Sequence, residues 1–149
     1  MDFDHPAPHV VEIAVQPEDI DAYEHVNNAV YLTWLDRAAW SHSGALGVPL
    51  EQCVALRRGM AAQRIEIEYL RAALRGDVVQ AATWIADSDG RLRAERRFQV
   101  RRKGDGQTLA RARIDYVCIN LDSGRAVRMP DSFARAYVPT PHLTRKIRS

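Results

Sequence analysis

The sequence contains no long hydrophobic run and only two cysteines. None of its apolar stretches approaches the ~20 residues that a membrane-spanning helix needs, and it does not start like a secretory signal peptide. The two cysteines, Cys53 and Cys118, form no CxxC pair and fall in different expected elements. We therefore expect a cytoplasmic protein without a membrane span, in which both cysteines are reduced thiols.

Basic residues are missing from the first quarter of the chain. Residues 1–36 contain no Lys or Arg but eight acids, whereas residues 91–113 contain nine bases and two acids. The net charge is only +2, so total charge does not favour nucleic acid as a partner. We interpret the basic stretch mainly as exposed strand faces that resist edge pairing, and expect one or two of its arginines to contact phosphate.

The composition is that of one globular domain spanning residues 1–149. Hydrophobic residues make up 46% and charged residues 27% of the chain, which are ordinary values for a soluble fold. No internal repeat or linker divides it. Residues 1–8, acidic and interrupted by proline, and residues 140–149 are expected to be loose arms.

Periodicity predicts one long helix followed by an antiparallel β region. Apolar residues recur at helical spacing from Asn28 to about Ser43, where Gly44 and Gly47 end the pattern. Alternating apolar residues and turn signals predict the strands. The expected strands are 9–16, 64–70, 78–86, 92–103 and 109–121, with short helical segments at 49–53 and 131–136. One sheet wrapped around one apolar helix is an α+β arrangement.

Residues 19–28 carry the most chemically informative stretch. It contains two aspartates (Asp19 and Asp21), an imidazole (His25) and two amides immediately before a helix start. A helix N-terminus combines unpaired backbone N–H groups with the positive end of the helix dipole. Attack on a carbonyl needs at least a nucleophile or base, which a carboxylate provides, and a site that stabilises the oxyanion, which the helix start provides.

Two motifs in this chain resemble a known family. D-x-D-x-x-x-H-V-N-N-x-x-Y at residues 19–31 and I-E-Y-L-x-x-A-x-x-G-D at residues 67–77 are similar to the hotdog-fold acyl-CoA thioesterases of the 4-hydroxybenzoyl-CoA thioesterase family. The resemblance covers roughly residues 9–138. It implies a five-stranded antiparallel sheet around one long central helix, in a homodimer or homotetramer with active sites at subunit interfaces. It also implies hydrolysis of acyl-CoA or acyl-carrier thioesters without metal or other cofactor.

The same resemblance assigns roles to five residues. The catalytic carboxylate of the family falls on Asp21, which would act as nucleophile or as general base. The backbone N–H of Asn28 takes the oxyanion role. His25, Asn27 and Tyr31 are expected to support substrate binding, although Asn27 suits a helix cap equally well and Tyr31 suits core packing.

Three acids near the motif need separate interpretation. Asp36, on the helix, is an alternative to Asp21 as the catalytic carboxylate, because some hotdog enzymes place their acid there. The simpler interpretation is that Asp36 forms an ion pair with Arg37. Asp19 is interpreted as a loop residue. Glu24 departs from the family pattern, which commonly has Gly before the H-V-N-N stretch, and so suggests a somewhat different turn.

Two other functions remain open. A non-catalytic acyl-CoA or acyl-carrier binding module would keep the basic patches and apolar pocket without needing Asp21. A hotdog dehydratase or hydratase typically has a His five residues after its Asp. Here His25 follows Asp21 by four residues and Asp19 by six, so that spacing is not met.

Overall fold

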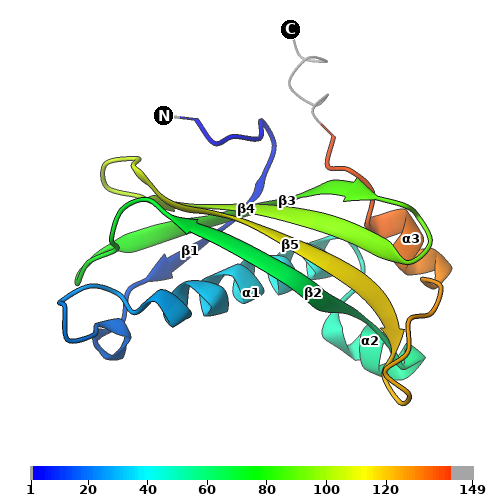
Figure 1. The fold of residues 1–149 in the computed structure, drawn as a ribbon. Helices are drawn as coiled ribbons and strands as arrows, with labels where there is room; N and C mark the ends of the chain where they lie inside the picture. The colour runs from blue at the N-terminus through cyan, green and yellow to red at the C-terminus, as the bar shows by residue number, and fades with distance from the viewer. Residues whose placement is uncertain (1, 142–149) are drawn as a thin grey trace, which may run out of the picture.

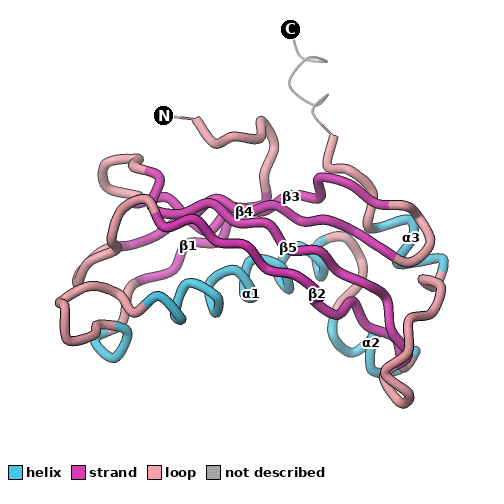
Figure 2. The backbone as a smooth tube through the Cα atoms, in the orientation of Figure 1, coloured by secondary structure: helices cyan, strands magenta, loops and turns pink. Residues whose placement is uncertain are grey.

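One antiparallel sheet forms most of the computed structural model, which describes residues 2–141. Its five strands lie in the spatial order β1-β3-β4-β5-β2, and all four pairings are antiparallel. The strands are β1 (His9–Ala14), β2 (Arg58–Tyr69), β3 (Val78–Ser88), β4 (Arg93–Arg102) and β5 (Thr108–Asn120). The sheet curves, and its concave side faces the long helix (Figures 1 and 2).

That helix, α1 (Asn28–Ala45), begins and ends where local chemistry dictates. The side chain of Asn27 accepts a hydrogen bond from the backbone N–H of Ala29 at 2.8 Å and so caps the first turn. Gly47, just beyond the helix, has a φ of +93°, a conformation that glycine adopts without steric cost. The shorter helices are η1 (Pro17–Asp19), α2 (Leu50–Leu56) and α3 (Asp131–Ala136).

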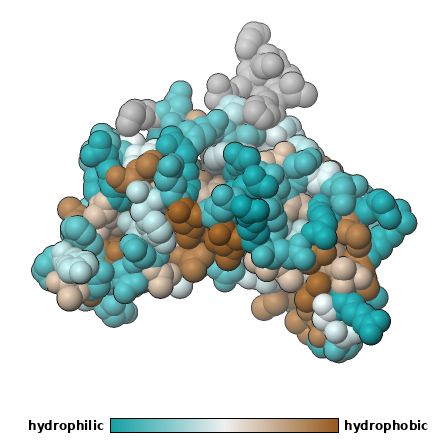
Figure 3. All heavy atoms as spheres, viewed as in Figure 1, coloured by the Kyte–Doolittle hydropathy of each residue, from teal (hydrophilic) through white to brown (hydrophobic). Residues whose placement is uncertain are grey.

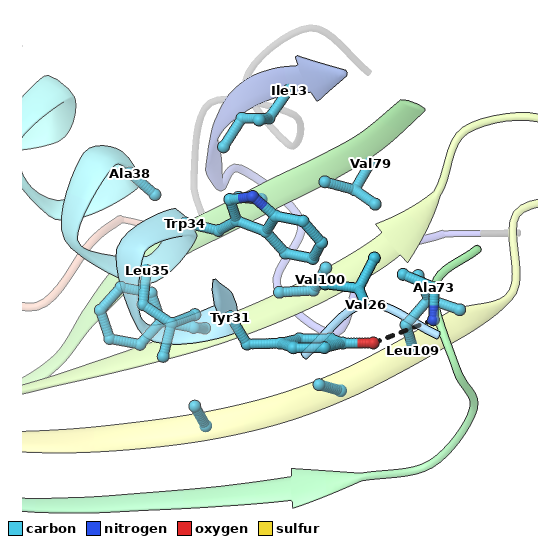
Figure 4. Close-up of a cluster of buried hydrophobic side chains, with 14 of the residues drawn as sticks. Ile13, Val26, Tyr31, Trp34, Leu35, Ala38, Ala73, Val79, Val100 and Leu109 are labelled. Atoms are coloured by element: carbon cyan, nitrogen blue, oxygen red, sulfur yellow. Dashed lines mark hydrogen bonds between the residues drawn. The ribbon is translucent and has the colours of Figure 1, made fainter. Parts of the chain in front are cut away.

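The main core lies between α1 and the sheet. Tyr31, Trp34, Leu35 and Ala38 are each 2% exposed or less and form the buried stripe of α1. They pack with sheet residues such as Val79, Val100 and Leu109 (Figure 4). A second apolar cluster lies around α2 and α3 at the other end of the sheet. Burial of the main core fixes α1 against the sheet and thereby positions the loop that precedes it.

The predicted fold is confirmed, with differences at element ends. β2 begins at Arg58 rather than at Arg64, because a bulge between Ala62 and Arg64 breaks the alternation that reveals the strand. α2 extends to Leu56, three residues past the expected 49–53 turn. Both cysteines are free thiols, as predicted. None of the described helices is long and apolar enough to cross a membrane.

The N-terminal segment is not a loose arm over residues 2–8. Asp4 forms an ion pair with Arg111 at 2.7 Å, and its backbone N–H donates to the side chain of Gln99. His5 is buried and stacks on Trp84. The segment therefore packs on the face of the sheet opposite α1 (Figure 1), because its polar and aromatic side chains find partners there. Of the expected C-terminal arm, residues 142–149 lie outside the described residues.

Candidate active site

The loop before α1 closes into a compact turn. The backbone N–H of Asp21 donates to the carbonyl of His25 at 2.8 Å, and the N–H of Glu24 donates to the carbonyl of Asp21 at 3.0 Å. Ile20 and Val26 form an isolated antiparallel bridge at the base of the turn. Val26 is buried, so the turn is anchored at one point while its other residues face outward.

Glu24 is strained within this turn. Its φ is +64°, in the left-handed region where a side chain is disfavoured and glycine is at ease. The turn therefore has the conformation suited to the Gly that the family commonly places here, and Glu24 bears the strain of adopting it. Non-glycine residues held in this way concentrate at functional sites.

Asp21 is the first residue of the turn. One carboxylate oxygen, Oδ1, accepts a hydrogen bond from the backbone N–H of Tyr23 at 2.9 Å, which orients the group. The side chain is only partly buried, and none of the ion pairs within residues 2–141 includes it. A carboxylate without a cationic partner keeps its charge available for a substrate or water.

The other acid of the motif, Asp19, is a structural residue. Its Oδ2 accepts from the backbone N–H of Gln16 at 2.8 Å, and its carbonyl accepts from the N–H of Asn27 at 2.8 Å. These bonds fix the chain on both sides of the turn. The expected loop role of Asp19 agrees with this geometry.

Asn28 begins α1 and has an exposed side chain. The N–H groups of the first helical turn have no intrahelical acceptor, and the N–H of Asn28 donates no other hydrogen bond within the described residues. The carbonyl of Asn28 accepts from the hydroxyl of Tyr69 at 2.9 Å. That bond holds the carbonyl of Asn28 in place, while the N–H of Asn28 stays open to a ligand.

The three expected binding residues lie in different surroundings. Asn27 uses its side-chain oxygen to cap α1, so it acts on the helix rather than outward. His25 is exposed on the turn. Tyr31 is buried, and its hydroxyl accepts a hydrogen bond from the backbone N–H of Ala73 at 3.0 Å (Figure 4).

Ala73 joins the two sequence motifs in space. Its N–H bonds to Tyr31, and its carbonyl accepts from the N–H of Val26 at 3.0 Å. The residue is completely buried. The loop after β2 therefore holds the turn that carries Asp21.

The expected ion pair between Asp36 and Arg37 is wrong. No ion pair joins these side chains in the part of the chain that the structure describes. Adjacent residues on a helix point in directions about 100° apart, whereas residues three or four apart face each other. Asp36 instead lines a cavity beside the second half of α1.

That cavity contains a polar cluster absent from the expected site. Arg96 on β4 is 3% exposed; its guanidinium donates to Nδ1 of His42 at 2.6 Å and to Oγ of Ser43 at 3.2 Å. The sequence does indicate that Arg96 is unusual, because the alternation of the strand places it on the same face as the apolar Ala94 and Phe98. An arginine in the apolar phase of a strand is expected to be buried.

The basic stretch of residues 91–113 is largely paired. Its members form ion pairs with acids of the same or other strands, including Arg97 with Glu95 on β4 and Lys103 with Glu12 on β1. Arg102 contacts Asp77 at 2.9 Å. These contacts support the interpretation of most of the stretch as strand surface. No cluster of His, Cys, Asp or Glu suited to a metal ion occurs within residues 2–141.

Several known proteins with a similar sequence or fold are thioesterases. The chain is 27% identical over 121 residues to the long-chain acyl-CoA thioesterase FadM of Escherichia coli, covering 79% of this chain and 88% of FadM. A 1,4-dihydroxy-2-naphthoyl-CoA thioesterase from Synechocystis has the same fold, with a TM-score of 0.79, 20% identity and coverage of 88% and 96%.

A protein from Staphylococcus aureus solved in complex with CoA is also similar. It superposes with a TM-score of 0.81 at 20% identity, covering 95% of this chain and 92% of that one. The family model described as the Thioesterase-like superfamily matches residues 15–137, which is most of the chain and includes both motifs. The chain therefore belongs to the thioesterase-like superfamily, and its fold is the hotdog fold.

Proposed function

We propose that this protein is an acyl-CoA thioesterase that uses Asp21 and the backbone N–H of Asn28. The single observation that carries the proposal is the placement of an unpaired carboxylate on a rigid turn directly before an open helix N-terminus. The superfamily match and the similarity to FadM support the substrate class. The similar S. aureus protein binds CoA, which supports CoA as the carrier.

Asp21 would supply the nucleophilic step in either of two ways. Its carboxylate attacks the thioester carbonyl, or it removes a proton from a water molecule that attacks. In both routes the carbon–sulfur bond breaks and the CoA thiolate takes up a proton. Direct attack leaves the acyl group on Asp21 as a mixed anhydride, which a water molecule then hydrolyses to the free acid and the regenerated carboxylate, whereas attack by the activated water gives the free acid directly. The hydrogen bond from Tyr23 orients the carboxylate without neutralising it.

The N–H of Asn28 would stabilise the oxyanion that forms on the carbonyl. Negative charge near a helix N-terminus is favoured by the helix dipole. An oxyanion donor of this kind contributes about 3 kcal/mol to transition-state stabilisation. Exposed His25 lies on the same turn, where it would contact bound substrate, whereas Asn27 and Tyr31 would act by holding the turn and helix in place.

We further propose that the enzyme works as a homodimer or homotetramer. β2 lies at one edge of the sheet and exposes Ile65 and Tyr69, which are 45% and 42% accessible. Apolar atoms also gather over α2 (Figure 3), where Leu50 and Val54 are exposed. Exposed apolar side chains that gather in this way are typical of an interface. A second subunit would cover the turn at Asp21, which the single chain leaves open.

Turnover of a panel of thioesters tests the proposal. Aromatic and aliphatic acyl-CoA substrates and acyl-carrier protein substrates are compared by the release of free thiol. The proposal predicts steady multiple turnover of at least one acyl-CoA. Saturable binding of acyl-CoA without turnover of any thioester would instead identify a binding module, and hydration of an enoyl-CoA would identify a hydratase.

A further inference from the structure

A buried cation lines the cavity beside the second half of α1. Arg96 on β4 is 3% exposed, and none of the ion pairs within residues 2–141 includes it. Arginine stays protonated even when it is buried. A buried charge is costly unless a counter-charge or a full set of hydrogen bonds compensates it. Arg96 therefore needs compensation from its surroundings.

The neighbours of Arg96 are polar but neutral. Burial and the nearby Arg96 cation lower the pKa of His42 to about 3, so its imidazole is neutral and accepts from the guanidinium through Nδ1. Burial raises the pKa of Tyr116 to about 12, so its phenol is also neutral, and it hydrogen-bonds to Arg96. Ser43 accepts from Arg96 and bonds to the hydroxyl of Tyr137 at 2.9 Å. None of these groups supplies a negative charge.

The guanidinium has more donors than these partners use. It carries five N–H groups, and within residues 2–141 three partners receive a hydrogen bond from it: His42, Ser43 and Tyr116. Arg96 also forms part of the wall of a cavity of about 80 Å³. A space of that size holds a few water molecules or a small charged group. The rest of its wall is mainly apolar and aromatic, with Trp40, Met60 and Ile85 among its members, and it also includes Asp36.

We propose that this cavity binds the carboxylate group of a small ligand, with Arg96 as its counter-ion. A carboxylate accepts two parallel N–H bonds from a guanidinium and is flat enough for the space. The neutral hydroxyl of Tyr116 provides a further donor, and the apolar wall accommodates a short hydrocarbon stem. Ser43 lies roughly 20 Å along α1 from Asn28, so within one chain the cavity is separate from the turn at Asp21. The proposal therefore goes beyond the proposed thioesterase chemistry.

Asp36 makes the proposal testable without altering the buried cluster. Its exposed carboxylate lines the same cavity and repels a second carboxylate. The substitution Asp36→Asn removes that repulsion at an exposed helix position, so the fold is retained. Asp2→Asn, in the N-terminal segment, makes the same change in net charge outside the cavity wall and serves as the matched control.

Binding is measured by isothermal titration with butanoate and with its neutral isostere butanamide, near neutral pH and at fixed ionic strength. The wild type is expected to bind butanoate about tenfold or more tightly than butanamide, because a charge-assisted pair is lost with the amide. Asp36→Asn is expected to tighten butanoate binding several-fold, and Asp2→Asn to leave it unchanged. Arg96→Lys, which keeps the charge but loses the planar fork, is expected to weaken it.

A second arm distinguishes a free acid from the carboxylate end of an acyl group. Adipyl-CoA and hexanoyl-CoA have acyl chains of equal length, but only the first ends in a carboxylate. A kcat/KM preference for adipyl-CoA that rises in Asp36→Asn assigns the cavity to the acyl group of a thioester held at the turn of a partner subunit, because a six-carbon chain does not span the separation within one chain. Butanoate binding with no such preference assigns it to a free acid. Equal binding of butanoate and butanamide together with equal turnover of both thioesters would overturn the proposal, whether or not the protein is a thioesterase.

Discussion

The hydroxyl of Tyr31, inside the core, accepts a hydrogen bond of 3.0 Å from the backbone N–H of Ala73. Both residues are almost completely buried, so no solvent replaces this bond if it is lost. Because the carbonyl of Ala73 also receives the N–H of Val26, the contact links the helix, the turn and the loop after β2. The geometry of the turn therefore depends on a residue in the core.

Removing the Tyr31 hydroxyl is predicted to cost stability and activity together. In Tyr31→Phe the N–H of Ala73 stays buried without an acceptor, which destabilises the fold by about 1–3 kcal/mol. Denaturant unfolding measures this change, and kcat is expected to fall because the turn loses its anchor. Unchanged stability would mean that the hydrogen bond is replaced or contributes nothing.

Relieving the strain at Glu24 is predicted to stabilise the protein. Glu24→Gly permits the positive φ at no steric cost but increases the entropy of the unfolded chain, so the expected net gain is about 0.5–1 kcal/mol. Glu24→Ala is the matched control, because it removes the same charge while keeping the strained backbone. If both variants gain equally, the charge of Glu24 and not its backbone is the source of the effect.

His42 is predicted to make the protein less stable in acid. Burial lowers its pKa from the ordinary 6.5 to about 3. Below pH 6.5 the unfolded chain takes up a proton on His42 that the folded chain does not, so the free energy of unfolding falls as pH decreases towards 3. The contribution of one such group approaches 1.4 kcal/mol per pH unit.

The variant His42→Asn isolates that contribution. Its side-chain oxygen can accept from Arg96 in place of Nδ1, but it does not titrate. The free energy of unfolding is measured by denaturant at several pH values for both proteins. The account predicts a shallower acid dependence in the variant, and parallel curves would show that His42 does not drive the loss.

Two exposed arginines are predicted to bind the phosphates of CoA. Arg71 and Arg75 flank Ala73 on the loop that holds the turn, and no ion pair within residues 2–141 includes either. Replacing both with Gln is expected to raise KM for acyl-CoA several-fold with little change in kcat. Acyl-pantetheine, which lacks the nucleotide phosphates, is the control substrate, and an equal effect on it would contradict the assignment. Arg125→Gln, on a distant hairpin, is the control variant.

Much of this architecture could be predicted because it rests on local patterns. The helical stripe of α1 and the alternation in β3, β4 and β5 are visible in the sequence, and each turn carries its own Gly or Asp signal. The start of β2 was hidden, because the bulge at Ala62 shifts the alternation by one residue. The packing of residues 2–8 was also hidden, since their partners Gln99 and Arg111 are about a hundred positions away.

The candidate site was only partly predictable for the same reason. The motif placed Asp21 and Asn28 only seven positions apart along the chain, but the support of their turn by Ala73 depends on a contact across the fold. The sequence shows that Glu24 stands where the family commonly has Gly, but it does not show that Glu24 has a positive φ. The alternation in the sequence places Arg96 on the apolar face of its strand. The cavity beside Arg96 could not be predicted, because four strands and two helices form it.

The most direct measurement is the turnover number of Asp21→Asn compared with Asp19→Asn. Both substitutions remove one negative charge from the same loop, but only Asp21 is assigned to the chemistry. With the best acyl-CoA of the wild type, the account predicts that Asp21→Asn lowers kcat by about 10²–10⁴-fold with the fold intact. Asp19→Asn, which loosens a loop hydrogen bond, is expected to retain most of the activity. Wild-type turnover in Asp21→Asn would contradict the account.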